Sequence, residues 1–156
     1  MKKEGFIPAM ISLIVLSVIL IGLVAYSIEH TRILGPLLVF FALFPLIIIK
    51  SSGRSVRSTG ADVIFGAIDT GVLMIAALIG ASLAGILGAI IGSAIGDSIT
   101  DGLAGLFEGS AAESLREYGI QEARTPLSSS MGKMSGCLIG AGSVLTVAWT
   151  FLGLLI

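Results

Sequence analysis

Long apolar runs dominate the sequence and constrain its fold more than any other feature. The first run covers residues 6–28 and the second covers residues 33–49, and the polar segment Glu29-His30-Thr31-Arg32 separates them. The hydrocarbon core of a bilayer is about 30 Å thick, so about 20 consecutive apolar residues in a helix can cross it. These runs predict transmembrane helices, and we expect an all-α integral membrane protein.

The third apolar stretch, residues 62–107, is too long for a single crossing. As one straight helix it would be about 69 Å long. We therefore predict a tight hairpin, with Gly80-Ala81-Ser82 as the turn. Together with a last apolar run, the sequence predicts five spans, at about residues 6–28, 33–49, 62–80, 83–107 and 131–155.

Composition agrees with one membrane domain covering residues 1–156. Of these residues 55% are hydrophobic and only 12% are charged, so lipid must cover much of the apolar surface. The net charge of −1 and the lack of a dense basic stripe argue against a nucleic-acid partner. Cys137 and His30 are each the only residue of their kind, which excludes an intrachain disulfide and the usual zinc spacings. A signal peptide is the competing interpretation of the first run, but the run is too long and Tyr26-Ser27-Ile28-Glu29 is a poor cleavage site.

Basic residues predict the orientation. With the N-terminus inside, only Arg32 lies outside, and the inner side carries Lys2, Lys3, Lys50, Arg54, Arg57, Arg116, Arg124 and Lys133. Such an excess of Lys and Arg is typical of the cytoplasmic side of a membrane protein. We expect the chain to lie in a prokaryotic cytoplasmic membrane.

Two rows of small residues run along the predicted fourth span. Positions four apart share one face of a helix. The first row is Ala81, Gly85, Ala89, Ser93, Asp97, Asp101, Gly105 and Gly109, and the second row is Ala84, Gly88, Gly92, Gly96, Thr100 and Ala104. Small residues let membrane helices approach closely, so we expect the fourth span to pack against Gly132, Gly136 and Gly140 of the fifth.

Helix packing does not explain the two carboxylates of the first row. From the inner ends of their spans, Asp101 lies at a depth of about 9 Å, Asp97 at about 15 Å and Asp69 at about 10 Å. A charged residue deep in a bilayer is costly, and such residues usually line a polar interior that moves ions or protons. We expect no Lys or Arg inside the spans, so a cation or protons must neutralise these carboxylates. The alternatives are that Asp101 is hydrated at the inner interface and that Asp62 only favours the start of its helix.

Further oxygen ligands lie near these carboxylates in the sequence. Thr70, Ser93, Ser98 and Thr100 offer hydroxyl groups, and Glu108 either is solvated or lies at the inner mouth of the carboxylate path. Calcium takes 6–8 oxygen ligands of this kind. We therefore predict a site for Ca²⁺ or Na⁺ as the transported ion, with no other cofactor. Its predicted ligands are Asp69, Asp97, Asp101, Thr70, Ser93, Thr100 and Glu108.

The polar segment after the fourth span carries a capping pattern. Ser110 is followed three residues later by Glu113, as in a capping box. This pattern predicts a short amphipathic helix over residues 111–118, within an inner-side loop that covers residues 110–130.

Residues 62–155 resemble the mitochondrial inner-membrane family called transmembrane protein 65. The similar elements are Gly66-Ala67-Ile68-Asp69-Thr70, then Gly96-Asp97-Ser98-Ile99-Thr100-Asp101, then Thr125-Pro126-Leu127, and finally the glycines spaced four apart from Gly132. In that family an Asn stands where this chain has Thr70 and another where it has Asp97, and a Ser stands where it has Thr100. The resemblance implies a role in sodium-dependent calcium efflux, as the exchanger or as a regulator.

Two functions follow as hypotheses. The first is a cation antiporter, most simply calcium efflux coupled to sodium or protons, that works as a homodimer in the lipid bilayer. The alternative is a membrane scaffold or a regulatory subunit that packs through its glycine faces and does not transport. An enzyme is not expected: Asp101-Gly102-Leu103-Ala104 resembles the start of the CDP-alcohol phosphotransferase signature, but Gly105 replaces the arginine that comes next.

Overall fold

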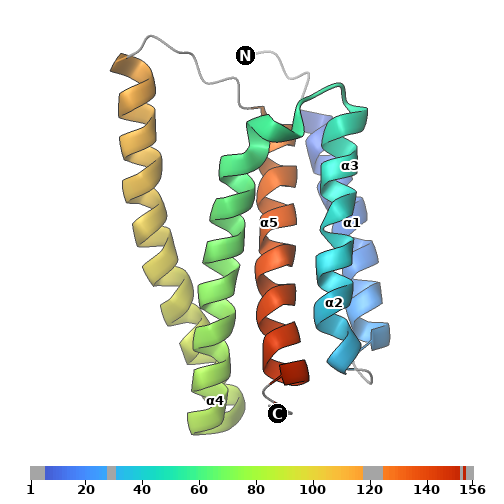
Figure 1. Cartoon of the computed structure of the whole chain (residues 1–156), viewed down its shortest axis with the longest axis vertical. Coiled ribbons are helices and arrows are strands. Elements are labelled where there is room, and N and C mark those ends of the chain that lie inside the picture. Colours follow the sequence, from blue (N-terminus) through green and yellow to red (C-terminus); the bar gives the residue numbers. More distant parts are fainter. Residues whose placement is uncertain (1–5, 28–30, 118–124, 152, 154–156) are drawn as a thin grey trace. The chain divides into compact units, whose positions relative to one another are not determined.

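The computed structural model describes residues 6–27, 31–117, 125–151 and 153. In the described residues the elements are all helical: α1 (Phe6–Ser27), α2 (Thr31–Phe41), α3 (Leu43–Ser51), η2 (Val56–Thr59), α4 (Gly60–Glu117), α5 (Pro126–Thr146) and η3 (Val147–Phe151) (Figure 1). They form two compact units. The first unit contains Met1–Gly71 and Thr125–Ile156, and the second contains Val72–Arg124.

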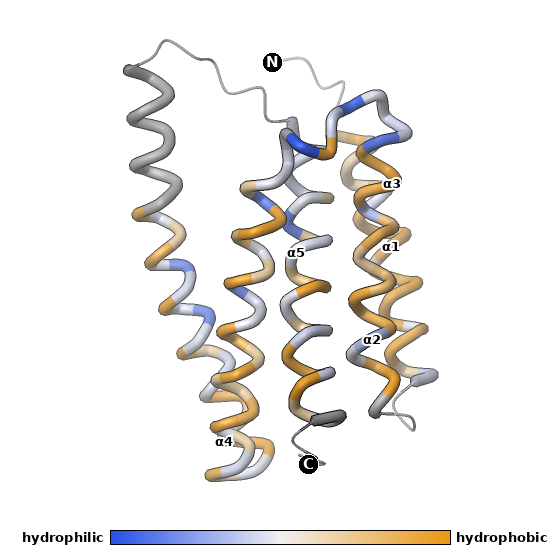
Figure 2. The backbone as a smooth tube through the Cα atoms, viewed as in Figure 1, coloured by the Kyte–Doolittle hydropathy of each residue, from blue (hydrophilic) through white to orange (hydrophobic). Residues whose placement is uncertain are grey.

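Four helical stretches are long and apolar enough to cross a membrane: Phe6–Ser27, Ile33–Ser51, Gly60–Leu106 and Pro126–Trp149. Their hydrophobic character is continuous along α1 and α3 and is interrupted by polar positions in α4 and α5 (Figure 2). Many large apolar side chains on these helices are exposed, including Val18 of α1 and Leu83 of α4. An apolar surface of this extent is compatible with a membrane environment.

The second predicted span is a helix interrupted once, at Ala42 between α2 and α3. Pro45 is the third residue of α3 and has no N–H to donate to the carbonyl of Phe41, which accounts for the break near this position. The buried Ser135 hydroxyl of α5 donates a hydrogen bond of 2.9 Å to the carbonyl of Ala42. α5 thus contacts the backbone where the helix is interrupted.

The fifty-eight residues of α4 are two helices that meet at a sharp turn. Ala84 (φ −142°, ψ 24°) and Gly85 (φ 59°, ψ −139°) leave the helical region. We call residues 60–83 the first arm and residues 86–117 the second arm. The predicted hairpin is present, and its turn at Ala84-Gly85 lies within a few residues of the predicted Gly80-Ala81-Ser82. A glycine suits the positive φ that this reversal needs.

Contacts within the first unit show that the first arm and α5 run parallel. Gly132 lies against Thr59 and Asp62, Gly136 against Val63 and Ala67, and Gly140 against Ala67 and Gly71. Both helices therefore begin at the same end of the first unit.

The segment after the fourth span differs from its prediction. The second arm continues as a helix to Glu117, so Ser110 lies inside a helix and does not cap a short one over residues 111–118. The capping box is instead at the start of α5, where Thr125 accepts a hydrogen bond from the Ser128 N–H and Pro126 is the first helical residue. The last span thus begins at Pro126 and not at 131. The remaining loop residues 118–124 lie outside the described part.

The core of the first unit is built around α5. A methyl group added at Gly35 of α2 would lie 2.9 Å from the carbonyl oxygen of Gly142, so these two backbones are in direct contact. Leu38 of α2, Ile49 of α3 and Met131 of α5 are buried. By contrast, most apolar side chains of α1 are exposed. The second predicted span is therefore central to the packing of this unit, and the first is more loosely held.

Candidate functional site

The second arm has one covered face, and that face is the second row of small residues. Gly88 lies against Gly80 of the first arm, Gly92 against Ala76, and Gly96 against Leu73 and Ala76. A methyl group at Gly92 would overlap the carbonyl oxygen of Ala76. Further along the same row, Thr100 is 2% exposed and Ala104 is 8% exposed. The close approach that the glycines predicted is real.

The partner of this glycine face differs from the expected one. Gly88, Gly92 and Gly96 pack against the first arm, and Gly132, Gly136 and Gly140 of α5 also pack against residues of the first arm. The expectation that the fourth span packs on the glycines of the fifth is therefore wrong for these positions. Glycine spacing shows that a face can be approached closely, but it does not identify the helix that approaches.

In the first row of small residues, the two carboxylate side chains are exposed. Asp97 and Asp101 are exposed, one helical turn apart, whereas Ser93 of the same row is half-buried. The two carboxylates thus lie beside the tightly packed glycine face and not within it. Side chains at positions four apart are about 5–6 Å apart at Cβ, so these two can share one cation.

The hydroxyl groups of the second arm bond to its own backbone. Thr100 donates to the carbonyls of Gly96 (3.1 Å) and Asp97 (3.0 Å) as alternatives, Ser93 donates to Ile90 (2.9 Å), and Ser98 donates to Ala94 (2.8 Å). Each hydroxyl oxygen keeps lone pairs with which to accept or to coordinate. The hydroxyl of Thr100 lies next to Asp101 in sequence but on the covered face.

The predicted ligands Asp69 and Thr70 lie on the first arm, within the first unit, and both are half-buried. Each unit is described by itself, so a single site that joins Asp69 to Asp97 and Asp101 stays a prediction. Glu108 and Glu113 lie on the helical second arm, but their side chains are outside the described part. Among the described residues, no group of three or more His, Cys, Asp or Glu side chains is close enough to hold a metal ion.

Two charged residues, Asp62 and Lys133, make contacts between helices that the sequence did not predict. Asp62 is 3% exposed and accepts a hydrogen bond of 3.2 Å from the Ser129 hydroxyl of α5. Lys133 lies within the apolar stretch Pro126–Trp149 and also within the span predicted at residues 131–155, so the expectation of no Lys or Arg inside the spans is wrong. Its ammonium lies 5.0 Å from the centre of the Phe65 ring. The signal in the sequence was the spacing of Asp62, Phe65 and Asp69, which places them on one helix face.

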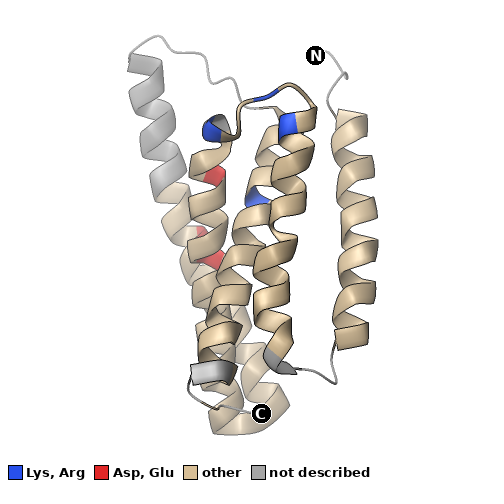
Figure 3. Cartoon of the chain, turned by 45° about the vertical axis from the view of Figure 1, so that its right-hand side comes forward, with Lys and Arg blue, Asp and Glu red and all other residues tan. Residues whose placement is uncertain are grey.

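The described basic side chains outside α5 lie at one end of the first unit, around the connection from α3 to η2 (Figure 3). Lys50 lies in the last turn of α3, Arg54 follows before η2, and Arg57 lies within η2. The first arm and α5 begin at this same end. The assignment of this end to the inner side of a membrane stays a prediction.

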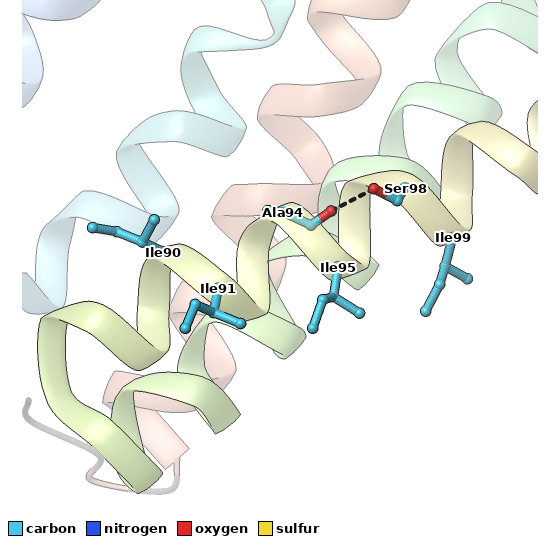
Figure 4. A pocket seen from close by; sticks show the side chains of 6 residues that line it. All are labelled: Ile90, Ile91, Ala94, Ile95, Ser98 and Ile99. Atoms are coloured by element: carbon cyan, nitrogen blue, oxygen red, sulfur yellow. Dashed lines mark hydrogen bonds between the residues drawn. The ribbon is translucent and has the colours of Figure 1, made fainter.

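An open apolar groove of about 470 Å³ runs along the second arm (Figure 4). Its lining residues are Ile90, Ile91, Ala94, Ile95, Ser98 and Ile99. The only side-chain hydroxyl in this set, that of Ser98, is bonded to the carbonyl of Ala94. The groove is suited to hydrocarbon and offers no polar substrate site.

No protein-family model, no curated protein and no solved structure matches this chain.

Proposed function

We propose that the chain is an integral membrane cation antiporter, in which intramembrane carboxylates bind Ca²⁺ and exchange it for Na⁺ or protons. The observation that carries the proposal is the pair Asp97 and Asp101, one turn apart on an apolar helix beside a face with direct backbone contact. Carboxylates within a membrane helix are costly unless they serve ions or protons. The resemblance to the transmembrane protein 65 family agrees with the same role.

The proposal makes Asp69 the third carboxylate. Within the second unit, Gly88 faces Gly80, Gly92 faces Ala76 and Gly96 faces Leu73, as in an antiparallel pair. Asp69 precedes Leu73 by one turn on the first arm, and Asp101 follows Gly96 by about one turn on the second. The proposed site requires that this register continue by that one turn.

Disulfide cross-linking tests the continued register. In a Cys137→Ser background, the pair Leu73→Cys and Gly96→Cys is the positive control, because a methyl group at Gly96 would lie 3.0 Å from the Leu73 Cα. We expect Asp69→Cys with Thr100→Cys to cross-link as efficiently as the control pair. Efficient cross-linking of the control alone would remove Asp69 from the site.

Calcium flux tests the function itself. Replacing Asp97 or Asp101 with Asn keeps the side-chain shape but removes the charge that attracts a divalent ion, and this attraction is strong where water is scarce. In proteoliposomes with an imposed sodium or pH gradient, we expect each of these variants to lose at least about tenfold in calcium flux, which corresponds to about 1.4 kcal/mol. Glu113→Gln, on the same helix but beyond the apolar stretch Gly60–Leu106, is the control and should transport normally.

The second candidate function is a scaffold or regulatory subunit. It is favoured by the extensive glycine contacts of α4 and α5, which serve packing without any ion. A protein of this kind would give no calcium flux in the wild type. Normal flux in both Asp97→Asn and Asp101→Asn would also reject the carboxylate site.

A further inference from the structure

The Lys133 side chain is exposed in the described chain, and at its level of α5 a bilayer would make an uncompensated charge costly. It belongs to the eighth residue of α5, about 10 Å from the start of the helix and within the apolar stretch Pro126–Trp149. Ionisable residues at such positions usually pair with one another or mark an ion pathway. A partner for this ammonium is therefore to be sought on the neighbouring helix.

That neighbour is the first arm, and its backbone is in contact at this level. A methyl group at Gly66 would lie 2.6 Å from the Lys133 carbonyl oxygen and 3.0 Å from the backbone nitrogen of Cys137. From this backbone position the Lys133 side chain reaches Phe65, with its ammonium 5.0 Å from the ring centre. The location of the charge is thus defined relative to residues of the first arm.

Phe65 lies between two carboxylates on its helix. Asp62 precedes it by three residues and Asp69 follows it by four, and both spacings bring side chains to about 5–6 Å at Cβ on one face. Asp62 is held by the Ser129 hydroxyl and is almost fully buried. Among the described groups on this face, one ammonium accompanies two carboxylates.

We propose that the Lys133 ammonium is a tethered counter-cation of Asp62 and Asp69, and that it competes with the transported cation for Asp69. The pairing of Lys133 with these carboxylates does not depend on the proposed function, whereas its competition with the transported cation rests on it. A cation that approaches Asp69 must displace the ammonium toward Asp62, and Asp62 keeps the ammonium paired when it moves. Lys133 thereby limits cation affinity and favours release.

The competing role for Lys133 is that of an interfacial anchor whose long side chain reaches toward water. An anchor would be insensitive to the charges of Asp62 and Asp69. The two roles are separated by a double-mutant cycle on thermal stability, which does not depend on transport.

The first experiment measures the melting temperature of the purified full chain in detergent. We expect Lys133→Met to lower it by about 5 °C or more, because it leaves buried carboxylate charge uncompensated. Adding Asp62→Asn or Asp69→Asn to this variant should restore most of the loss. Lys50→Met, at the exposed end of α3, is the matched control and should behave additively with both changes. Additive behaviour of Lys133→Met with both aspartate variants would overturn the pairing.

The second experiment measures binding of Ca²⁺ to the same proteins by titration calorimetry. Lys133→Met should bind Ca²⁺ about tenfold more tightly than wild type, and Lys133→Arg should not, because it keeps the charge. The gain should vanish in the Asp69→Asn background. One outcome separates the two parts of the proposal: the stability coupling is present, but neither the wild type nor Lys133→Met binds Ca²⁺. In that case the pairing of Lys133 with the carboxylates is supported. The competition with Ca²⁺, and the calcium function on which it rests, are rejected. Tight binding that is unchanged by Lys133→Met would reject the competition alone.

Discussion

Individual glycines of this chain fall into two physical classes. At Gly80, Gly88, Gly92 and Gly136 an added methyl group would overlap a backbone carbonyl, whereas at Gly102 and Gly105 nothing lies within 4 Å. Since both classes occur on the second arm, the same substitution has opposite effects at positions a few turns apart. The sequence pattern alone does not separate them, because Gly92 and Gly105 both belong to rows of small residues.

The pair Gly92→Ala and Gly105→Ala tests this difference. Gly92→Ala should destabilise the protein by about 1–3 kcal/mol, because the methyl group forces the two arms apart at Ala76. Gly105→Ala should stabilise it by up to about 1 kcal/mol, because alanine is the better helix former and finds open space. Titration with a denaturing detergent measures the free energy of unfolding of both variants and of the wild type. Equal effects of the two changes would contradict the contact between Gly92 and Ala76.

At the scale of helices, the turn between the two arms depends on one residue. Gly85 has a φ of 59° with a ψ of −139°, a combination that side-chain-bearing residues avoid. The preceding Ser82 hydroxyl donates to the carbonyl of Ile79, as it does inside a regular helix, so the first arm is still intact there. The position of the turn therefore depends on a glycine that can adopt this backbone conformation, and hydropathy does not predict it.

Gly85→Ala should cost about 1–3 kcal/mol through backbone strain alone, since no atom lies within 4 Å of an added methyl group. The matched control is Gly102→Ala, which also enters open space but at a helical φ. Thermal unfolding followed by circular dichroism measures both. A Gly85→Ala protein as stable as the control would show that the turn has another conformation.

The helix α1 differs from α2 in how tightly it is held. Removal of residues 1–27 should leave α2, α3 and α5 packed through Gly35, Gly142 and Ser135, none of which belongs to α1. We expect a lower yield and a lower melting temperature but unchanged calcium affinity, because residues 6–27 contain no acidic residue. Calorimetric titration of the truncated and full chains compares their affinities. A selective loss of calcium affinity in a folded truncation would place α1 at the site.

At the scale of the whole molecule, the first row of small residues has no cover at its carboxylates within the described chain. Asp97 and Asp101 are exposed beside isoleucines that line an apolar groove. In a bilayer, carboxylates in this position would face hydrocarbon unless another protein surface covers them. We propose that a second copy of the chain would supply such a surface and would bring its own carboxylates to the shared site.

We therefore expect a homodimer or a larger homo-oligomer. Mass determination by light scattering in detergent and in lipid nanodiscs measures the oligomeric state. The oligomer should dissociate more readily when Ca²⁺ is removed, because carboxylates from two copies then repel each other. Monomers in both environments, with calcium present, would exclude this arrangement.

Local properties of the sequence determined which segments are helices and roughly where they lie. Hydropathy and length are sums over neighbouring residues, so α1 and the combined α2 and α3 were predicted to within two residues at each end. α5 begins five residues before its predicted start, and its predicted end at 155 lies outside the described residues. Thr125-Pro126 marks the start of α5, whereas the similar pattern at Ser110 lies inside a helix, because a capping pattern also occurs by chance there. The carboxylates Asp69, Asp97 and Asp101 were likewise evident from their apolar surroundings.

Only the tertiary structure decided which helix faces meet. Gly132, Gly136 and Gly140 could approach any small-residue face, and the fold pairs them with the first arm because the arm and α5 start at the same end. It also put Lys133 beside Phe65, a contact between residues sixty-eight positions apart that no local pattern encodes. Helix formation depends on near neighbours along the chain, whereas the partner of a face and the counter-charge of a carboxylate depend on how separate helices come together in space.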